Sequence, residues 1–199
     1  MWHMRHCLQI FLSQEMVEKA PKLPQDIQWH FIGHLQSNKI KAILEGVPNL
    51  AMIETVDTVK LADKLNKAIE AAQRPPLRIF MQVNTSGEEA KSGVDPPGCV
   101  PLAAHIAKQC PHLQLAGLMT IGMLDYTSTP ENFKCLARCR DDVAKELSMQ
   151  PQDLELSMGM SGDFEMAIEM GSTNIRVGST IFGARKDPRL QAQSQQQPA

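Results

Sequence analysis

Two turns near the carboxyl end of the chain combine glycine, serine and threonine in a way that suits phosphate binding. Ser161 follows an apolar run at residues 154–158, and a Gly-Ser-Thr turn follows a second run at residues 174–177. Both runs read as strands, and each turn leads into a helical segment. Backbone N–H groups at a helix N-terminus point outward, the helix dipole favours an anion, and hydroxyls add donors. We therefore predict a phosphate site made of Ser161, Gly178, Ser179 and Thr180. Ordinary helix capping by the two serines is the competing interpretation.

Two further side chains could reach the same pocket. Arg176 alternates with Ile175 and Val177 along the second strand, so it faces away from both of them. An ion pair inside the fold is its alternative role. His34 follows an earlier expected strand at residues 28–32, where a pocket role and a structural role both stay open. We include Arg176 and His34 among the candidate site residues.

The elements that must position these residues alternate between short apolar strands and amphipathic helices. Apolar residues recur on one helical face after Asp57, which we predict to be an N-cap, and a second helical period follows Pro130. Such alternation is typical of parallel βαβ units, and barrels built from them bind ligands at the carboxyl ends of the strands. The sequence predicts six strands, at residues 28–32, 51–54, 78–83, 114–119, 154–158 and 174–177.

Separated motifs in a fixed order resemble one known family. The segment SMGMSGDFEMAIEMGSTNIRVGSTIFG at residues 157–183 is similar to the signature of the pyridoxal phosphate homeostasis proteins. The likeness continues through WHFIGHLQSNK (29–39), IETVD (53–57), QVNTSGEEAKSG (82–93) and GLMTIG (117–122), and it covers roughly residues 14–185. The resemblance implies a (β/α)8 barrel of the alanine racemase N-terminal type that binds pyridoxal 5′-phosphate (PLP) and serves PLP homeostasis without catalysis.

The resemblance also implies a role for the arginine. By likeness to the family, Arg176 approaches the pyridine nitrogen of PLP and keeps that nitrogen unprotonated. An unprotonated ring is a poorer electron sink, which suits carrying the cofactor more than activating it. The cofactor expected from the resemblance is therefore PLP, held by the phosphate turns and by Arg176.

The start of the chain departs from the family pattern. Family members begin with a strand that carries the Schiff-base lysine, in a pattern like AVSKTKP, and a second strand ends near FGENYVQE. The chain opens MWHMRHCLQIFLS and shows neither pattern. We therefore expect that the Schiff-base lysine is absent, that PLP binds non-covalently if it binds, and that Lys39 and Lys91 do not replace the missing anchor.

The expected domain organisation follows from the absence of the family's first two strand patterns. Residues 1–13 form a segment outside the family, residues 14–187 an incomplete barrel, and residues 188–199 a disordered tail. The expected fold is a TIM-barrel type of α/β fold that lacks its first two strands, with open edges beside residues 28–32 and 174–177. Open edges of a buried parallel sheet favour self-association.

Two other interpretations stay open. The chain could be a truncated isoform that does not bind PLP, or a fragment from a misassigned gene start. The second alternative is that the chain is an enzyme, a fold-type III racemase or decarboxylase. It requires the Schiff-base lysine, a second proton-transfer residue and usually a β-domain, for which 199 residues leave no room. We therefore expect a protein that is not an enzyme.

The composition of the chain excludes some classes of binding partner and favours a reducing compartment. The net charge of −2 gives no support for binding nucleic acid or an anionic membrane, and no apolar run approaches the roughly 18 residues of a spanning helix. The 5 cysteines are odd in number and irregularly spaced, which indicates reduced thiols. We expect a cytoplasmic protein, with an organelle as the alternative. Cys135 and Cys139 are expected to pack on one helix face, and no metal site is expected.

Overall fold

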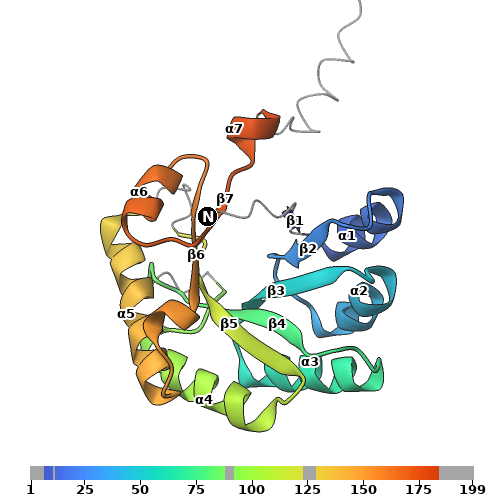
Figure 1. The fold of residues 1–199 in the computed structure, drawn as a ribbon, viewed down its shortest axis with the longest axis horizontal. Coiled ribbons are helices and arrows are strands. Elements are labelled where there is room, and N and C mark those ends of the chain that lie inside the picture. Colours follow the sequence, from blue (N-terminus) through green and yellow to red (C-terminus); the bar gives the residue numbers. More distant parts are fainter. Residues whose placement is uncertain (1–6, 11, 88–91, 123–128, 184–199) are drawn as a thin grey trace, which may run out of the picture.

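Seven parallel strands form one curved sheet in chain order, with helices covering its outer face (Figure 1). The computed structural model describes residues 7–10, 12–87, 92–122 and 129–183. The strands are β1 (Cys7–Ile10), β2 (Gln28–Phe31), β3 (Leu50–Val56), β4 (Leu77–Gln82), β5 (Leu113–Met119), β6 (Glu155–Met160) and β7 (Asn174–Arg176). Lys91 and the tail expected at residues 188–199 lie outside the described residues.

Each crossover between neighbouring strands carries helical structure, as parallel βαβ units require. The α-helices are α1 (Ser13–Lys19), α2 (Ile40–Gly46), α3 (Val59–Ala71), α4 (Cys99–Gln109), α5 (Pro130–Glu146), α6 (Phe164–Glu169) and α7 (Ser179–Phe182). Short 3-10 helices are η1 (Ala20–Lys22), η2 (Ser37–Lys39), η3 (Pro96–Gly98) and η4 (Pro151–Asp153).

The α/β barrel type of fold is confirmed, but the expectation of six strands was wrong. The seventh strand, β1, pairs in parallel with β2, from Cys7 opposite Gln28 to Ile10 opposite Phe31. The open edge expected beside residues 28–32 is therefore covered, and nothing in the structure supports a barrel that lacks two strands. The described residues show no ladder between β1 and β7. A hydrogen bond from Gln9 Nε2 to Asn174 Oδ1 (3.2 Å) joins these two strands instead.

The sheet is buried on both faces, as is usual for parallel strands. The larger apolar cluster lies between the strands and the helices and includes Trp29, Phe31 and Phe133. A smaller cluster fills the inside of the barrel, with Ile32, Met52, Phe80, Ala116 and Met119. Because strand side chains alternate, β2 sends Trp29 outward and His30 inward.

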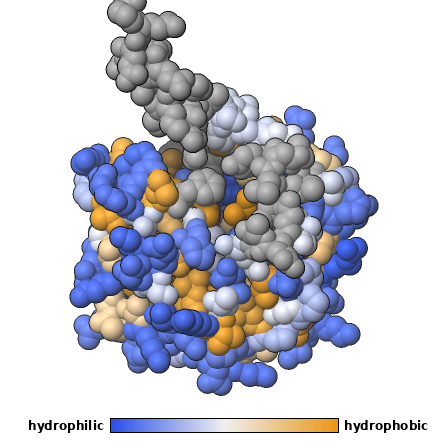
Figure 2. Space-filling view, turned by 180° about the vertical axis from the view of Figure 1, so that it is seen from behind, coloured by the Kyte–Doolittle hydropathy of each residue, from blue (hydrophilic) through white to orange (hydrophobic). Residues whose placement is uncertain are grey.

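The polar faces of the helices form much of the outer surface. Seen from behind, charged and polar residues surround a hydrophobic area in the middle of that face (Figure 2). In the described part of the chain, no helix is long and apolar enough to cross a membrane.

The observed first residues of helices α5 and α3 test two helix starts that were predicted from the sequence. Helix α5 begins at Pro130, as expected, and Thr129 and Asn132 form a capping box before it. Helix α3 begins one residue later than expected, because its N-cap is Thr58 and not Asp57. The Thr58 hydroxyl accepts a hydrogen bond from the Leu61 N–H at 3.3 Å.

We expect Thr58→Ala to lower the free energy of unfolding by about 1 kcal/mol, the usual effect of losing a side-chain cap. Chemical denaturation measured by circular dichroism checks the value. Thr58→Ser retains the hydroxyl and serves as the matched control. Equal losses in the two variants would show that the cap does not contribute.

Candidate functional site

The two predicted phosphate turns meet at the carboxyl ends of β6 and β7. Ser161 follows β6 directly, and the second turn leads into α7. The Ser161 Oγ accepts a hydrogen bond from the Gly178 N–H at 3.0 Å and from the Thr180 N–H at 3.5 Å. A ladder pairing between Met160 and Arg176 holds the two strand ends in register. Turns separated along the chain are therefore joined into one polar corner.

This corner leaves donors unused and space in front of them. A hydroxyl carries one donor and two acceptor lone pairs. Since Ser161 Oγ accepts in both contacts, its own O–H is left to donate elsewhere. Among the described residues, the Ser179 N–H has no hydrogen-bond partner. A Cβ built at Gly162 or Gly178 would meet nothing within 4 Å. Convergent donors beside open space are what an anion requires.

The turn after β6 has a shape that depends on Gly159 and Asp163. Gly159 has a φ of +94°, and a Cβ there would lie 2.6 Å from the Cβ of Ala167. Glycine therefore lets β6 turn tightly against α6. Asp163 Oδ1 accepts a hydrogen bond from the Met160 N–H at 2.6 Å and closes the turn. A hollow of about 260 Å³ opens along residues 161–166.

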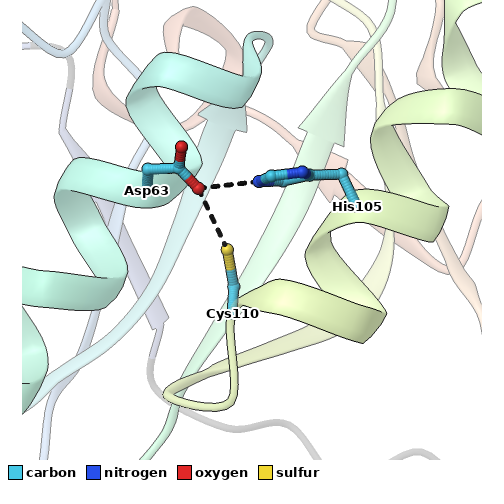
Figure 3. Close-up of side chains that lie close together, drawn as sticks. All are labelled: Asp63, His105 and Cys110. Atoms are coloured by element: carbon cyan, nitrogen blue, oxygen red, sulfur yellow. Dashed lines mark hydrogen bonds and ion pairs between the residues drawn. The ribbon is translucent and has the colours of Figure 1, made fainter.

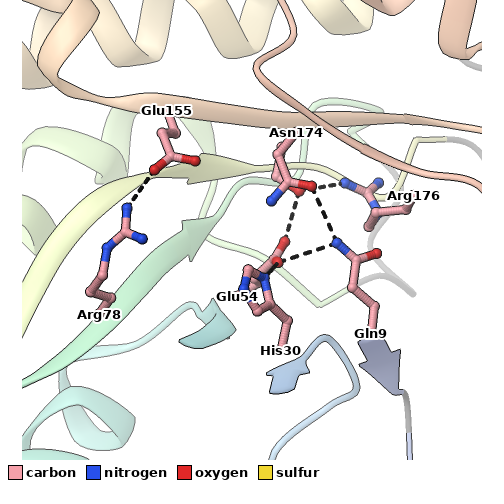
Figure 4. A network of polar contacts seen from close by, with 8 residues as sticks. Gln9, His30, Glu54, Arg78, Glu155, Asn174 and Arg176 are labelled. Atoms are coloured by element: carbon pink, nitrogen blue, oxygen red, sulfur yellow. Dashed lines mark hydrogen bonds and ion pairs between the residues drawn. The ribbon is translucent and has the colours of Figure 1, made fainter. Parts of the chain in front are cut away.

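Arg176, at the end of β7, points into the barrel toward Gln9, Glu54 and Asn174 (Figure 4). Its guanidinium donates to Ser157 Oγ at 2.8 Å and to the Thr120 carbonyl at 2.6 Å. The side chain is almost fully buried. Burial lowers the pKa of Arg176, while the nearby carboxylates of Glu54 and Asp163 act to raise it. These contacts fix the orientation of the cation and leave other guanidinium N–H groups to bind elsewhere.

A buried polar network inside the barrel was not predicted from the sequence. Its centre is Glu54, which is fully buried on β3. The Glu54 carboxylate accepts from Ser157 Oγ at 2.7 Å and lies 2.7 Å from His30 Nδ1, with Gln9 Nε2 at 3.5 Å. Figure 4 shows Gln9 from β1, His30 from β2 and Glu54 from β3 converging inside the barrel. An acidic residue in an apolar strand was the one available signal in the sequence.

The network contacts Arg176 through the hydroxyl of Ser157. Ser157 donates to Glu54 and accepts from Arg176, so the cation and the carboxylate are linked through one hydroxyl. The described residues show no direct ion pair of Arg176, so a barrel-interior ion pair stays an alternative interpretation. A second charged pair, Arg78 with Glu155, lies elsewhere in the barrel and is partly exposed (Figure 4).

His34 lies apart from the corner. It follows β2, it is exposed, and its Nδ1 lies 3.3 Å from Ser92 Oγ in the loop after β4. No described contact links His34 to the residues of the two turns or to Arg176. The structure thus brings the Ser161 turn, the Gly178–Ser179–Thr180 turn and Arg176 together, and it leaves His34 on a different part of the rim.

The described lysines are all surface residues. Every lysine in the described residues is exposed at the surface: Lys19, Lys22, Lys39, Lys41, Lys60, Lys64, Lys67, Lys108, Lys134 and Lys145. Lys39, which is not expected to replace the missing anchor, lies in η2 and is exposed. The expected packing of two thiols on one helix face is confirmed, since Cys135 and Cys139 both lie on α5 against the core.

Comparison with known proteins gives a consistent result. The model of the family "Alanine racemase, N-terminal domain" matches residues 12–186. The pyridoxal phosphate homeostasis protein of Homo sapiens is 48% identical over 181 residues, covering 86% of this chain and 66% of that protein. The protein of the same name in Caenorhabditis elegans is 44% identical over 181 residues, covering 87% of this chain and 74% of that protein. The chain therefore spans about two thirds of the length of the relatives that it matches.

Solved structures agree with the sequence relatives. A protein of unknown function from Bifidobacterium adolescentis has a TM-score of 0.79 at 36% identity, covering 89% of this chain and 75% of that one. PipY of Synechococcus elongatus, solved with PLP bound, has a TM-score of 0.68 at 32% identity, covering 88% of this chain and 80% of that one. Alanine racemase from Corynebacterium glutamicum, with a TM-score of 0.65 at 13% identity, shares the fold.

Proposed function

Because the chain belongs to the pyridoxal phosphate homeostasis proteins, within the alanine racemase N-terminal domain family, we propose that it binds PLP and serves intracellular PLP homeostasis without catalysing a reaction. The PipY neighbour solved with PLP bound supports PLP as the ligand. The observation that carries the proposal is the corner in which Ser161 Oγ accepts from the Gly178 and Thr180 N–H groups.

The chemistry of this corner fits the phosphate group of PLP. The hydroxyls of Ser161, Ser179 and Thr180 are donors, as is the Ser179 N–H, which has no partner among the described residues, and Gly162 and Gly178 leave open space beside them. In the proposed site these groups hold the phosphate. Charge-assisted hydrogen bonds of this kind contribute roughly 1.5–3 kcal/mol each before desolvation and ordering are subtracted.

Arg176 is proposed to face the pyridine nitrogen. When bound, PLP supplies an aldehyde and a ring that acts as an electron sink. A guanidinium donates hydrogen bonds and does not give up its proton, so it leaves the ring nitrogen unprotonated and weakens that sink. The contacts of Arg176 with Ser157 and Thr120 hold it in place for this role. A weakened sink suits storage and transfer of the cofactor, and it supports a non-catalytic role.

We propose that the chain binds PLP non-covalently. The exposure of every described lysine supports this mode, because a covalent anchor has to lie beside the bound ring. Equilibrium dialysis tests the proposal and is expected to give one PLP per chain, fully removed by further dialysis. Borohydride followed by peptide mass spectrometry is expected to find no lysine modified stoichiometrically. Absence of PLP binding would contradict the proposed function, and a single stoichiometric lysine adduct would contradict the binding mode.

Self-association through the remaining sheet edge is a separate proposal. The absence of a described ladder between β1 and β7 supports it. Unpaired strand edges favour association. Sedimentation velocity over a hundredfold range of concentration is expected to show a rising dimer fraction, and a monomer throughout would contradict the proposal.

The compartment is proposed to be the cytoplasm. The free thiols of Cys99, Cys110, Cys135 and Cys139 support a reducing environment, in which disulfides do not persist. Imaging of the fluorescently tagged protein in its own cells tests this location, and a signal confined to an organelle or outside the cell would contradict it.

A further inference from the structure

Three side chains with metal-binding atoms converge between α3 and α4, in the helical layer outside the barrel (Figure 3). Asp63 lies on α3, His105 on α4, and Cys110 directly after α4. Asp63 Oδ1 lies 2.7 Å from His105 Nε2 and 3.8 Å from Cys110 Sγ. All three ligand atoms lie within 4.8 Å of one another. None of these residues takes part in the proposed PLP site.

We propose that Asp63, His105 and Cys110 bind a zinc ion, with water as the fourth ligand. Tetrahedral zinc has bonds of about 2.0 Å to nitrogen and oxygen and about 2.3 Å to sulfur, so its ligand atoms stand roughly 3.3–3.6 Å apart. The observed separations of 2.7 and 3.8 Å, with all three ligand atoms within 4.8 Å, lie on either side of this range, and the proposal requires the side chains to adjust by rotation on binding. A set of one nitrogen, one oxygen and one sulfur ligand suits zinc, whereas magnesium and calcium take oxygen ligands.

The ion can reach the site from solvent. The Asp63 side chain is 43% exposed and that of His105 is 25% exposed, while Cys110 is buried beneath them. On binding, the Cys110 thiol loses its proton to solvent and its sulfur bonds to the metal. Zinc then takes the place of the two hydrogen bonds that Asp63 makes, and no oxidant or reductant is required.

A nucleophilic Cys-His-Asp arrangement does not fit the same residues. In such an arrangement histidine stands between the thiol and the carboxylate, whereas here the thiol and the imidazole both contact Asp63. Metal binding, which deprotonates a thiol by coordination, is the chemistry left to the trio.

Zinc at this place would tie α3 to α4. The two βα units already meet through the His112 N–H, which donates to Asn66 Oδ1 at 2.8 Å. A metal bound to the native state and not to the unfolded chain stabilises the fold by mass action. At a free zinc concentration about one hundred times the dissociation constant, we expect the melting temperature to rise by about 5–10 °C.

Titration of the metal-free chain with zinc alone, against a chromophoric chelator, tests the proposal. We expect one tightly bound zinc per chain. Cobalt in place of zinc is expected to give the intense visible bands of a four-coordinate site and a thiolate charge-transfer band. Cys110→Ser and His105→Gln are each expected to weaken zinc binding at least tenfold and to abolish the thermal shift. Both substitutions preserve size, and circular dichroism confirms that the variants are folded.

Matched controls separate this trio from other ligands of the same type. Cys135→Ser removes a thiol on α5, and His112→Gln removes a histidine that pairs with Glu70 across the neighbouring surface. Both controls are expected to bind zinc like the parent chain. A parent chain that binds no zinc overturns the proposal. Zinc binding that survives in folded Cys110→Ser and His105→Gln, or that is lost equally in the controls, also overturns it.

Discussion

Replacing Ser179 and Thr180 together by alanine is expected to lower the affinity for PLP at least about a hundredfold. The proposed site loses two hydroxyl donors to a phosphate, each contributing roughly 1.5–3 kcal/mol before desolvation and ordering, and about 2.7 kcal/mol corresponds to a hundredfold. Affinity for pyridoxal, which lacks the phosphate, should change by less than about twofold. Equilibrium dialysis with both vitamers measures the two affinities.

Ser92→Ala is the matched control for this double variant. Ser92 is exposed on the rim of the barrel and contacts His34, apart from the two turns. We expect it to bind PLP like the parent chain. If Ser92→Ala weakens binding as much as the double variant does, the phosphate does not lie at Ser179 and Thr180, and the rim around His34 becomes the better candidate.

Removing the Glu54 side chain is expected to have the largest effect on stability. Glu54 is fully buried, and Glu54→Ala leaves His30 and Ser157 without their shared carboxylate and the buried Arg176 without a nearby negative charge. Removing one partner from a buried charged network lowers stability by about 3–5 kcal/mol. Since domains are stable by about 5–15 kcal/mol in total, this loss is a large fraction of the stability of the chain.

Glu155→Ala is the control, because it makes the same substitution in an ion pair that is partly exposed. The Glu155 side chain is 36% exposed and that of its partner Arg78 is 37% exposed, so we expect a loss of about 1 kcal/mol or less. Urea denaturation of both variants gives the comparison. Losses of equal size would mean that the interior network does not organise the barrel.

The sequence predicted the parts of this structure that local patterns encode. The six expected strands correspond to β2 to β7, because their apolar runs and intervening helical periods are strong. Strand β1 was missed because it is only Cys7–Ile10, without clear alternation, and its pairing with β2 depends on tertiary context. The N-cap of α3 was misplaced by one residue, since Asp57 and Thr58 are both good caps.

In the candidate site, too, local patterns predicted some residues, whereas the contacts between distant segments could not be predicted. The turn residues could be predicted because glycine, serine and threonine after a strand are local signals. The position of Ser161 beside Gly178 depends on the pairing of β6 with β7, which spacing along the chain does not give. The partners of Glu54 could not be predicted, because Ser157 lies 103 residues away in sequence; only the acidic residue within an apolar strand gave a local signal. The trio of Asp63, His105 and Cys110 depends on the packing of α3 against α4.

The most direct test of the central claim compares PLP with pyridoxal on the unmodified chain by equilibrium dialysis. Pyridoxine 5′-phosphate and pyridoxine form an aldehyde-free pair that excludes reaction with surface lysines. If the corner at Ser161 and Gly178–Ser179–Thr180 holds the phosphate, each phosphorylated vitamer should bind at least about a hundredfold more tightly than its dephosphorylated form. Equal binding of the phosphorylated and dephosphorylated forms would contradict the proposed site.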